Sequence, residues 1–216
     1  MFPRPQTAGL LGILAGTSLV ILLLLFMTAG VTMDAFADPA TALPRLAQDA
    51  GRFRLIAALT TITVALALLF ITGLAARLRD KAPTRATGVL YFGVLGLVGH
   101  GLGGMIFWAG VPALTARASV DQVAAAHAWV AINALTAALD GFGNLFVGLS
   151  ILLAGWAVTT GAGAGMSPAL GWYGVAAGAL TALAVCAPGV EVLMLGAFVL
   201  PIVWLLWAGS ALRRAA

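Results

Sequence analysis

The sequence has very little charge. Only 8% of its 216 residues are charged and 62% are hydrophobic, whereas a soluble globular domain carries about a quarter charged residues. A soluble protein of this length could not cover its surface with so few polar groups. The shortage excludes a water-soluble fold and indicates a chain that lies mostly in lipid.

Cysteine and catalytic motifs are scarce too. Cys186 is the only cysteine, so an intrachain disulfide is excluded, and its apolar neighbours predict a buried, inert thiol. We find no phosphate-binding glycine loop, no nucleophile elbow and no cysteine or histidine spacing typical of a metal site. We therefore expect no cofactor, no metal and no nucleic-acid partner, and an intramembrane redox protein or enzyme is the least supported function class.

The hydrophobic residues are gathered in six continuous runs. A helix needs about 20 apolar residues to cross the hydrocarbon core, and the runs lack the alternation of membrane β-strands. The predicted transmembrane spans are about residues 8–31, 55–75, 89–111, 129–157, 170–187 and 192–212, with a short outer helix at about residues 39–50. The expected fold class is all-α: a polytopic integral membrane helix bundle that forms one domain over residues 1–216.

Basic residues collect on one side of these spans. The loop after the second span and the two chain ends carry seven basic residues and one acidic, while the opposite loops carry four basic and five acidic. Because basic loops stay inside, both termini are predicted to be cytoplasmic. Aromatic anchors are expected at the outer interface (Trp108, Trp129) and at the inner one (Trp156, Trp172, Tyr91).

The first span has one competing interpretation. Ala35-Phe36-Ala37 resembles a signal-peptidase site, but the apolar run before it is longer than the 7–15 residues typical of a signal peptide. We expect the span to be retained as a transmembrane helix.

One carboxylate lies well inside an apolar run. An ionisable group at bilayer depth costs about 2.5–3.5 kcal/mol, so Asp140 needs a partner. At about 100° per residue, Asn133 and Asn144 lie within about 20° of Asp140 around the helix. These three residues form one polar stripe that should face the interior of the bundle.

His100, near the midpoint of the third span, is the expected partner of that stripe. Glycines at four-residue spacing flank it and would let another helix approach closely. Since the third and fourth spans are antiparallel neighbours, we predict a hydrogen bond from His100 to Asp140 or Asn144. The candidate site is thus an intramembrane polar cluster of His100, Asn133, Asp140 and Asn144, with no catalytic residue assigned. It could serve only to hold helices together, or it could bind a proton or ligand.

His127 is the second histidine of the chain. Two histidines can ligate a haem, but His127 is expected at the outer entrance of the fourth span and His100 at mid-membrane. A shared haem is therefore not expected.

The layout resembles an uncharacterised bacterial membrane family, domain of unknown function 4386. The resemblance rests on the entry Gly51–Leu55 into the second span, the stretch Gly141–Leu149, Gly155-Trp156, and Leu170-Gly171-Trp172. It covers nearly the whole chain and implies a six-helix architecture but no activity. The expected location of this multi-pass chain is the cell inner (plasma) membrane.

Two function classes remain after the enzyme is set aside. The first is an accessory or structural membrane component that packs against other membrane protein subunits through glycine-rich helices. The second is a small transporter or channel-like protein that uses the His/Asp/Asn cluster. In both, the lipid bilayer is the principal partner.

Overall fold

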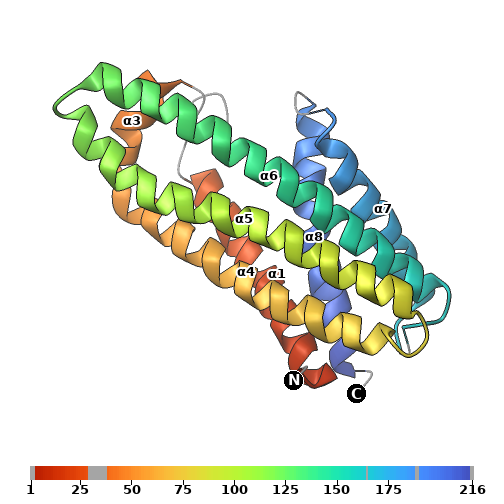
Figure 1. Ribbon diagram of the computed structural model, residues 1–216. Coiled ribbons are helices and arrows are strands. Elements are labelled where there is room, and N and C mark those ends of the chain that lie inside the picture. The colour runs from red at the N-terminus through yellow and green to blue at the C-terminus, as the bar shows by residue number, and fades with distance from the viewer. Residues whose placement is uncertain (1–2, 29–37, 164, 188–189, 215–216) are drawn as a thin grey trace.

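The computed structural model describes residues 3–28, 38–163, 165–187 and 190–214, which form seven helices and contain no strand (Figure 1). The helices are α1 (Pro5–Thr28), α3 (Pro39–Gln48), α4 (Ala50–Leu78), α5 (Pro83–Ala118), α6 (Gln122–Thr159), α7 (Pro168–Ala184) and α8 (Glu191–Arg214). The expected all-α helix bundle is confirmed. The end of the first predicted span and the motif Ala35-Phe36-Ala37 lie outside the described residues.

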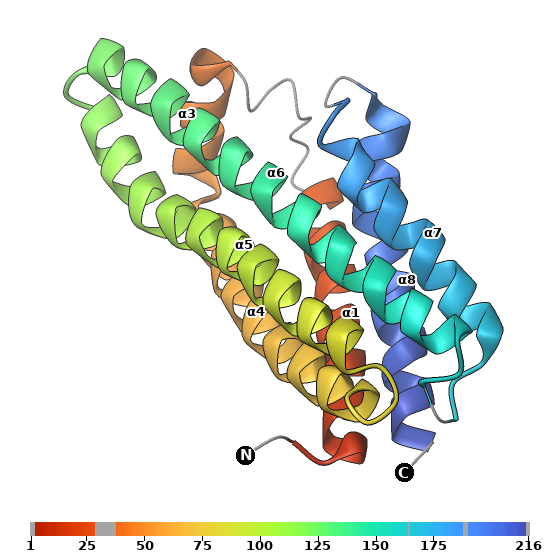
Figure 2. The ribbon, with the colours of Figure 1, turned by 45° about the vertical axis from the view of Figure 1, so that its right-hand side comes forward.

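Six of these helices form a closed ring in the order α1, α4, α5, α6, α7 and α8, with α8 packed against α1. The first turn of α1 and the last turn of α8 lie at the same end of the bundle (Figures 1 and 2). An even number of passes produces this arrangement, as the charge pattern requires. We call this end, where α5 and α7 also begin, the inner end.

Helix lengths agree only partly with six full crossings. Five helices, α1, α4, α5, α6 and α8, are long and apolar enough to cross a membrane, whereas α7 has 17 residues. At 1.5 Å per residue α7 spans about 25 Å, less than the hydrocarbon thickness of about 30 Å. By the same measure α5 and α6, with 36 and 38 residues, exceed 50 Å and must tilt or project beyond the core.

Glycine allows the closest helix contacts. A Cβ built on Gly178 of α7 would lie 2.5 Å from the carbonyl oxygen of Gly148 on α6, and one built on Gly209 of α8 would lie 2.7 Å from that of Gly9 on α1. At these points backbone touches backbone, which only a residue without a side chain permits. The glycine-rich faces of these helices are thus occupied within the chain.

The apolar core has two parts. The inner cluster joins the six ring helices around Phe70 and Trp204, whose rings meet edge to face at 5.8 Å. The outer cluster lies beneath α3 and includes Phe53 and Trp129. Trp129 is only 1% exposed, so its prediction as an outer-interface anchor was wrong: α3 and its neighbours cover the ring. The side chain of Trp108 lies outside the described part of the structure.

The inner interface matches its prediction. Trp156, Trp172 and Tyr91 are 49%, 65% and 66% exposed at the inner ends of α6, α7 and α5. These amphipathic rings suit the headgroup region of a bilayer. Cys186 is exposed just past the end of α7, so the expectation of a buried thiol was wrong, because the helix stops before the apolar run does.

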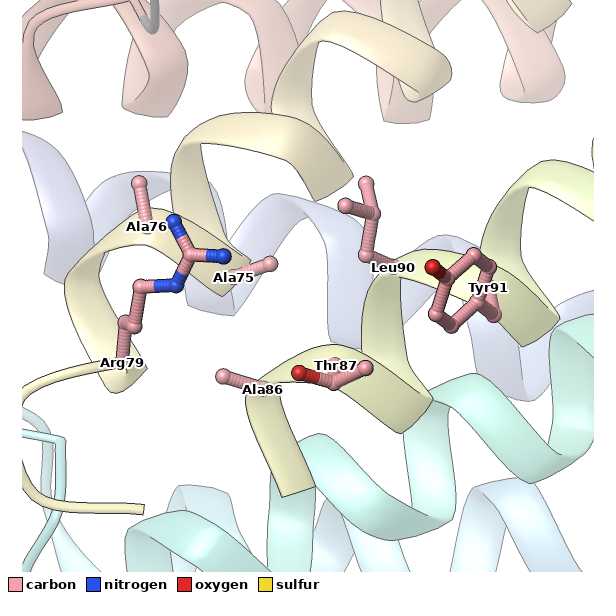
Figure 3. Close-up of a pocket in the computed structure, with 7 residues that line it drawn as sticks. All are labelled: Ala75, Ala76, Arg79, Ala86, Thr87, Leu90 and Tyr91. Carbon is pink, nitrogen blue, oxygen red and sulfur yellow. The ribbon is translucent and has the colours of Figure 1, made fainter. Parts of the chain in front are cut away.

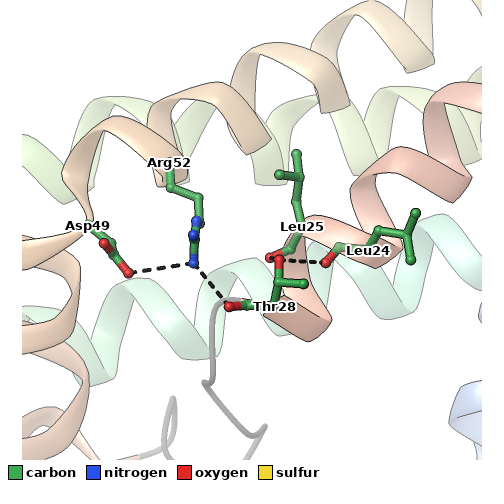
Figure 4. A network of polar contacts seen from close by, with 5 residues as sticks. All are labelled: Leu24, Leu25, Thr28, Asp49 and Arg52. Atoms are coloured by element: carbon green, nitrogen blue, oxygen red, sulfur yellow. Dashed lines mark hydrogen bonds and ion pairs between the residues drawn. The ribbon is translucent and has the colours of Figure 1, made fainter.

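Polar contacts stabilise the start of α3 and the junction between α1 and α4. Asp38 caps α3 by accepting a hydrogen bond of 3.1 Å from the amide of Ala40, and Pro39 occupies the first turn, where its missing N–H costs nothing. Arg52 of α4 lies 3.7 Å from the carboxylate of Asp49 and donates to the carbonyl of Thr28 at 3.1 Å (Figure 4). Arg52 thereby satisfies one of the open carbonyls at the end of α1 and ties α1 to the start of α4.

Candidate intramembrane polar site

His100 and Asp140 lie at the midpoints of the two longest helices. His100 is 17 residues from the start of α5 and 18 from its end; Asp140 is 18 residues from the start of α6 and 19 from its end. Since α5 and α6 form an antiparallel hairpin joined by a short turn, the two midpoints come level with each other. Their positions along the two helices therefore set the two side chains at the same depth.

Nδ1 of His100 and Oδ1 of Asp140 are joined by a hydrogen bond of 3.2 Å, so the predicted contact is present. With the carboxylate ionised, the Nδ1–H of His100 donates; with the carboxyl protonated, its O–H can donate to a bare Nδ1. The pair thus keeps one hydrogen bond in either protonation arrangement. Their side chains are 26% and 50% exposed, so the chain itself covers only part of this polar pair.

Glycines make the space for the pair. A Cβ built on Gly143 of α6 would lie 2.8 Å from three atoms of the His100 ring, and one built on Gly103 of α5 would lie 3.3 Å from Oδ1 of Asp140. The imidazole therefore lies flat against the backbone of α6. Of the glycines at four-residue spacing from His100, Gly96 brings α6 close as the sequence suggests, whereas Gly104 faces Thr60 of α4.

The two asparagines extend the polar stripe along α6. Asn133 and Asn144 are half-buried on the same helix face as Asp140, and among the described contacts neither is hydrogen-bonded to His100 or Asp140. Of the two alternatives predicted for His100, the bond to Asp140 is present and a bond to Asn144 is not among the described contacts. Asp140 is therefore the member of the stripe that bonds to His100 within the described residues.

Thr136 belongs to this stripe and was not singled out from the sequence. It lies one turn from Asp140, its methyl group faces Gly103, and its hydroxyl is buried with no hydrogen-bond partner among the described residues. Threonines in apolar helices commonly bond their own backbone, as Thr60 does with Ile56 at 2.9 Å. The signal that could have revealed Thr136 was its spacing of three from Asn133 and four from Asp140.

The outer half of α6 is uncovered on the side that α7 covers further in. Val185, directly after α7, is the neighbour of Gly141, and beyond that point α6 leans away from α7 (Figure 2). Ala134, Ala137 and Ala138 are exposed there. Ala137 lies about 60° around the helix from Asp140, so this exposed small side chain adjoins the half-exposed carboxylate, while Ala134 and Ala138 lie further around the helix.

His127 is exposed near the start of α6, 13 residues from Asp140, and does not join the cluster. Within the described ranges no three His, Cys, Asp or Glu side chains are grouped as a metal site would need. The site therefore consists of the His100–Asp140 contact, the side-chain amides of Asn133 and Asn144, and the hydroxyl of Thr136.

The family model for domain of unknown function (DUF4386) matches residues 14–208, which is most of the chain. The chain belongs to the DUF4386 family. The match runs from within α1 to within α8 and so includes the whole polar stripe and the stretches Gly51–Leu55 and Gly141–Leu149. Comparison with curated proteins and with solved structures finds no match. As a DUF4386 protein, this chain is a membrane helix bundle to which the family assigns no activity.

Proposed function

We propose that the protein is an accessory or structural component of a bacterial inner membrane that binds a transmembrane helix of another membrane protein along the outer half of α6. The excess of basic residues at the inner end supports a cytoplasmic location for both termini. The observation that carries the proposal is the open face of α6 beyond Gly141, where exposed alanines extend around the helix from Ala137, about 60° from the half-exposed Asp140.

Two physical arguments support this face. Small side chains let a second helix approach closely, and polar groups across such a contact hydrogen-bond where lipid offers nothing. An ionisable side chain left against lipid at this depth would cost about 2.5–3.5 kcal/mol. A partner helix with a donor such as an asparagine, glutamine or lysine would complete the hydrogen bonding of Asp140.

The glycine-rich faces do not make this contact. Gly9, Gly148, Gly178 and Gly209 are in contact with the chain's own helices, so they are not available to a partner. The docking face proposed here is instead polar and alanine-rich.

The test uses a photo-crosslinking amino acid in place of Ala137 in native membranes. We expect a discrete adduct with a different membrane protein, lost when Ala134→Trp fills the same face. The matched control is Val98→Trp, which changes a residue of α5 that is 46% exposed and should leave the adduct intact. Adducts with lipid alone, or with a second copy of the 21.9 kDa chain, would overturn the proposal.

A small transporter is the second candidate, and the partial exposure of the His100–Asp140 pair favours it. A pair that can keep its hydrogen bond in two protonation arrangements is suited to carry a proton. In proteoliposomes, a transporter would show a pH-driven flux that Asp140→Asn abolishes without loss of the folded state. Absence of any such flux in the unaltered protein would exclude this candidate.

A further inference from the structure

A groove opens at the inner end between α6 and α7. It has a volume of about 450 Å³ and is lined by Leu152, Trp156, Thr159, Thr160, Trp172 and Val175. Its walls are aliphatic toward the centre of the bundle and carry two hydroxyls and two exposed indoles toward the inner end. This order of groups, from apolar to polar along one groove, matches the order from acyl chain to headgroup in a lipid leaflet.

Arg85, in the first turn of α5, lies beside the polar end of this groove. Its guanidinium carbon lies 4.6 Å from the centre of the Trp156 ring, a cation–π distance. Its Nη1 donates a hydrogen bond of 2.5 Å to Oγ1 of Thr160. Thr160 in turn donates to the carbonyl of Trp156 at 3.2 Å, so its hydroxyl is free to accept from Arg85.

The charge of Arg85 is not neutralised within the described residues, where it makes no ion pair. A guanidinium has five N–H donors, and the contact with Thr160 uses one of them. Trp156 and Thr160 hold the group in place, which reduces the entropy lost when an anion binds. The remaining donors can meet an oxyanion at the mouth of the groove.

We propose that this groove binds one anionic phospholipid, with its phosphate at the free N–H donors of Arg85 and its acyl chain along Leu152 and Val175. Arginine binds phosphate oxygens in a bidentate manner, and tryptophans at the interface pack against the glycerol region. A free phosphate would fill only the polar end and leave the aliphatic wall and both indoles uncovered. The lipid accounts for the whole groove.

A second, smaller groove at the same end offers a control. It lies between α4 and α5, has a volume of about 70 Å³, and places Arg79 across from Leu90 and Tyr91 (Figure 3). That volume is too small for a glycerol backbone with its chains. Arg79→Gln therefore removes the same charge from the same end of the molecule without touching the proposed lipid groove.

The experiment is native mass spectrometry of the full chain with added dioleoyl phosphatidylglycerol or dioleoyl phosphatidylcholine, which share acyl chains and differ in charge. We expect one retained phosphatidylglycerol and weaker retention of phosphatidylcholine. Arg85→Gln should weaken phosphatidylglycerol retention about fivefold to tenfold, while Arg79→Gln leaves it within about twofold. Trp156→Phe, which keeps an aromatic ring, checks that the fold tolerates changes in this groove.

Three outcomes would overturn the proposal. Equal retention of the two lipids would show that charge does not select the occupant. Equal losses from Arg85→Gln and Arg79→Gln would show a diffuse surface attraction. Full competition by glycerol phosphate, which has the headgroup oxyanion but no chains, would show an anion site that does not use the aliphatic wall.

Discussion

The imidazole of His100 lies against the bare backbone of Gly143, where a Cβ would come within 2.8 Å of Cδ2, Cε1 and Nε2. Gly143→Ala should therefore push the ring away from Asp140 and destabilise the bundle by about 1–3 kcal/mol. Unfolding in mixed micelles measures the loss, and the NMR shifts of the His100 ring report the broken contact.

Gly141→Ala is the matched control on the same helix. An added Cβ there would meet only Cγ1 of Val185 at 3.7 Å, so alanine should be neutral or gain up to about 1 kcal/mol from its higher helix propensity. Equal effects of the two substitutions would contradict the proposed role of Gly143.

The contact of α7 with α6 should be the least tolerant of added volume. A Cβ on Gly178 would lie 2.5 Å from the carbonyl oxygen of Gly148 and closer still to the amide of Leu152, and backbone cannot yield as a side chain can. We expect Gly178→Ala to cost about 3 kcal/mol or more. Gly196→Ala, whose Cβ would meet only Leu200 at 3.9 Å, should be neutral or slightly stabilising, as for Gly141→Ala.

A buried hydroxyl pair between α1 and α4 should respond unequally to its two deletions. Oγ of Ser18 and Oγ1 of Thr63 are 2.6 Å apart, and Thr63 already donates to the carbonyl of Leu59 at 2.7 Å, so Ser18 is the donor. Thr63→Val removes the acceptor of a buried hydroxyl and should cost about 1–3 kcal/mol. Ser18→Ala removes only a donor and should cost about 0.6 kcal/mol. Measured free energies of unfolding in the reverse order would refute this assignment.

Asp121 should contribute to stability in a pH-dependent way. The amide of Ala124 donates to its carboxylate at 3.0 Å, and this bond, with the charge of Arg117 at 3.1 Å, holds the pKa of Asp121 below its ordinary value of 3.8. A pKa that is lower in the folded state stabilises the protein above the unfolded pKa, and the contribution is lost as the pH falls through the folded pKa.

The measurement compares thermal unfolding of the unaltered chain and of Asp121→Asn over a pH series. Asparagine keeps the helix cap but not the charge. The unaltered chain should be the more stable at neutral pH, and the difference should vanish in acid. A difference that persists or grows in acid would contradict this origin.

Helix period and hairpin geometry were enough to predict the central pair. Asp140 and His100 each lie mid-run, and two antiparallel helices joined by a short turn must bring their midpoints level. The burial of Trp129 could not be predicted in this way. Its amphipathic ring suits a lipid interface as well as a core, and only the packing of α3 across the outer ends decides between them.

Two features of α7 and α6, the point where α7 ends and the angle between the two helices, could not be predicted from the sequence. The apolar run at residues 170–187 extends past Ala184, where α7 ends, because hydrophobicity shows what lipid accepts and not where backbone hydrogen bonding stops. The angle between α6 and α7 depends on how the glycines of both helices pack against each other. Because this packing involves two segments, it cannot be inferred from either one alone. The open face of α6 could therefore not be predicted.

The pairing of α1 with α8 has a consequence for biogenesis. The ribosome makes α1 first and α8 last, yet Gly9 meets Gly209 and the backbone of Arg213. Until α8 is made, Gly9 of α1 lacks its contact with α8, while the α5–α6 hairpin can assemble as it leaves the translocon. The ring closes only after α8 has been made, so a ribosome stalled before residue 200 should hold an unfinished bundle that is open to membrane proteases.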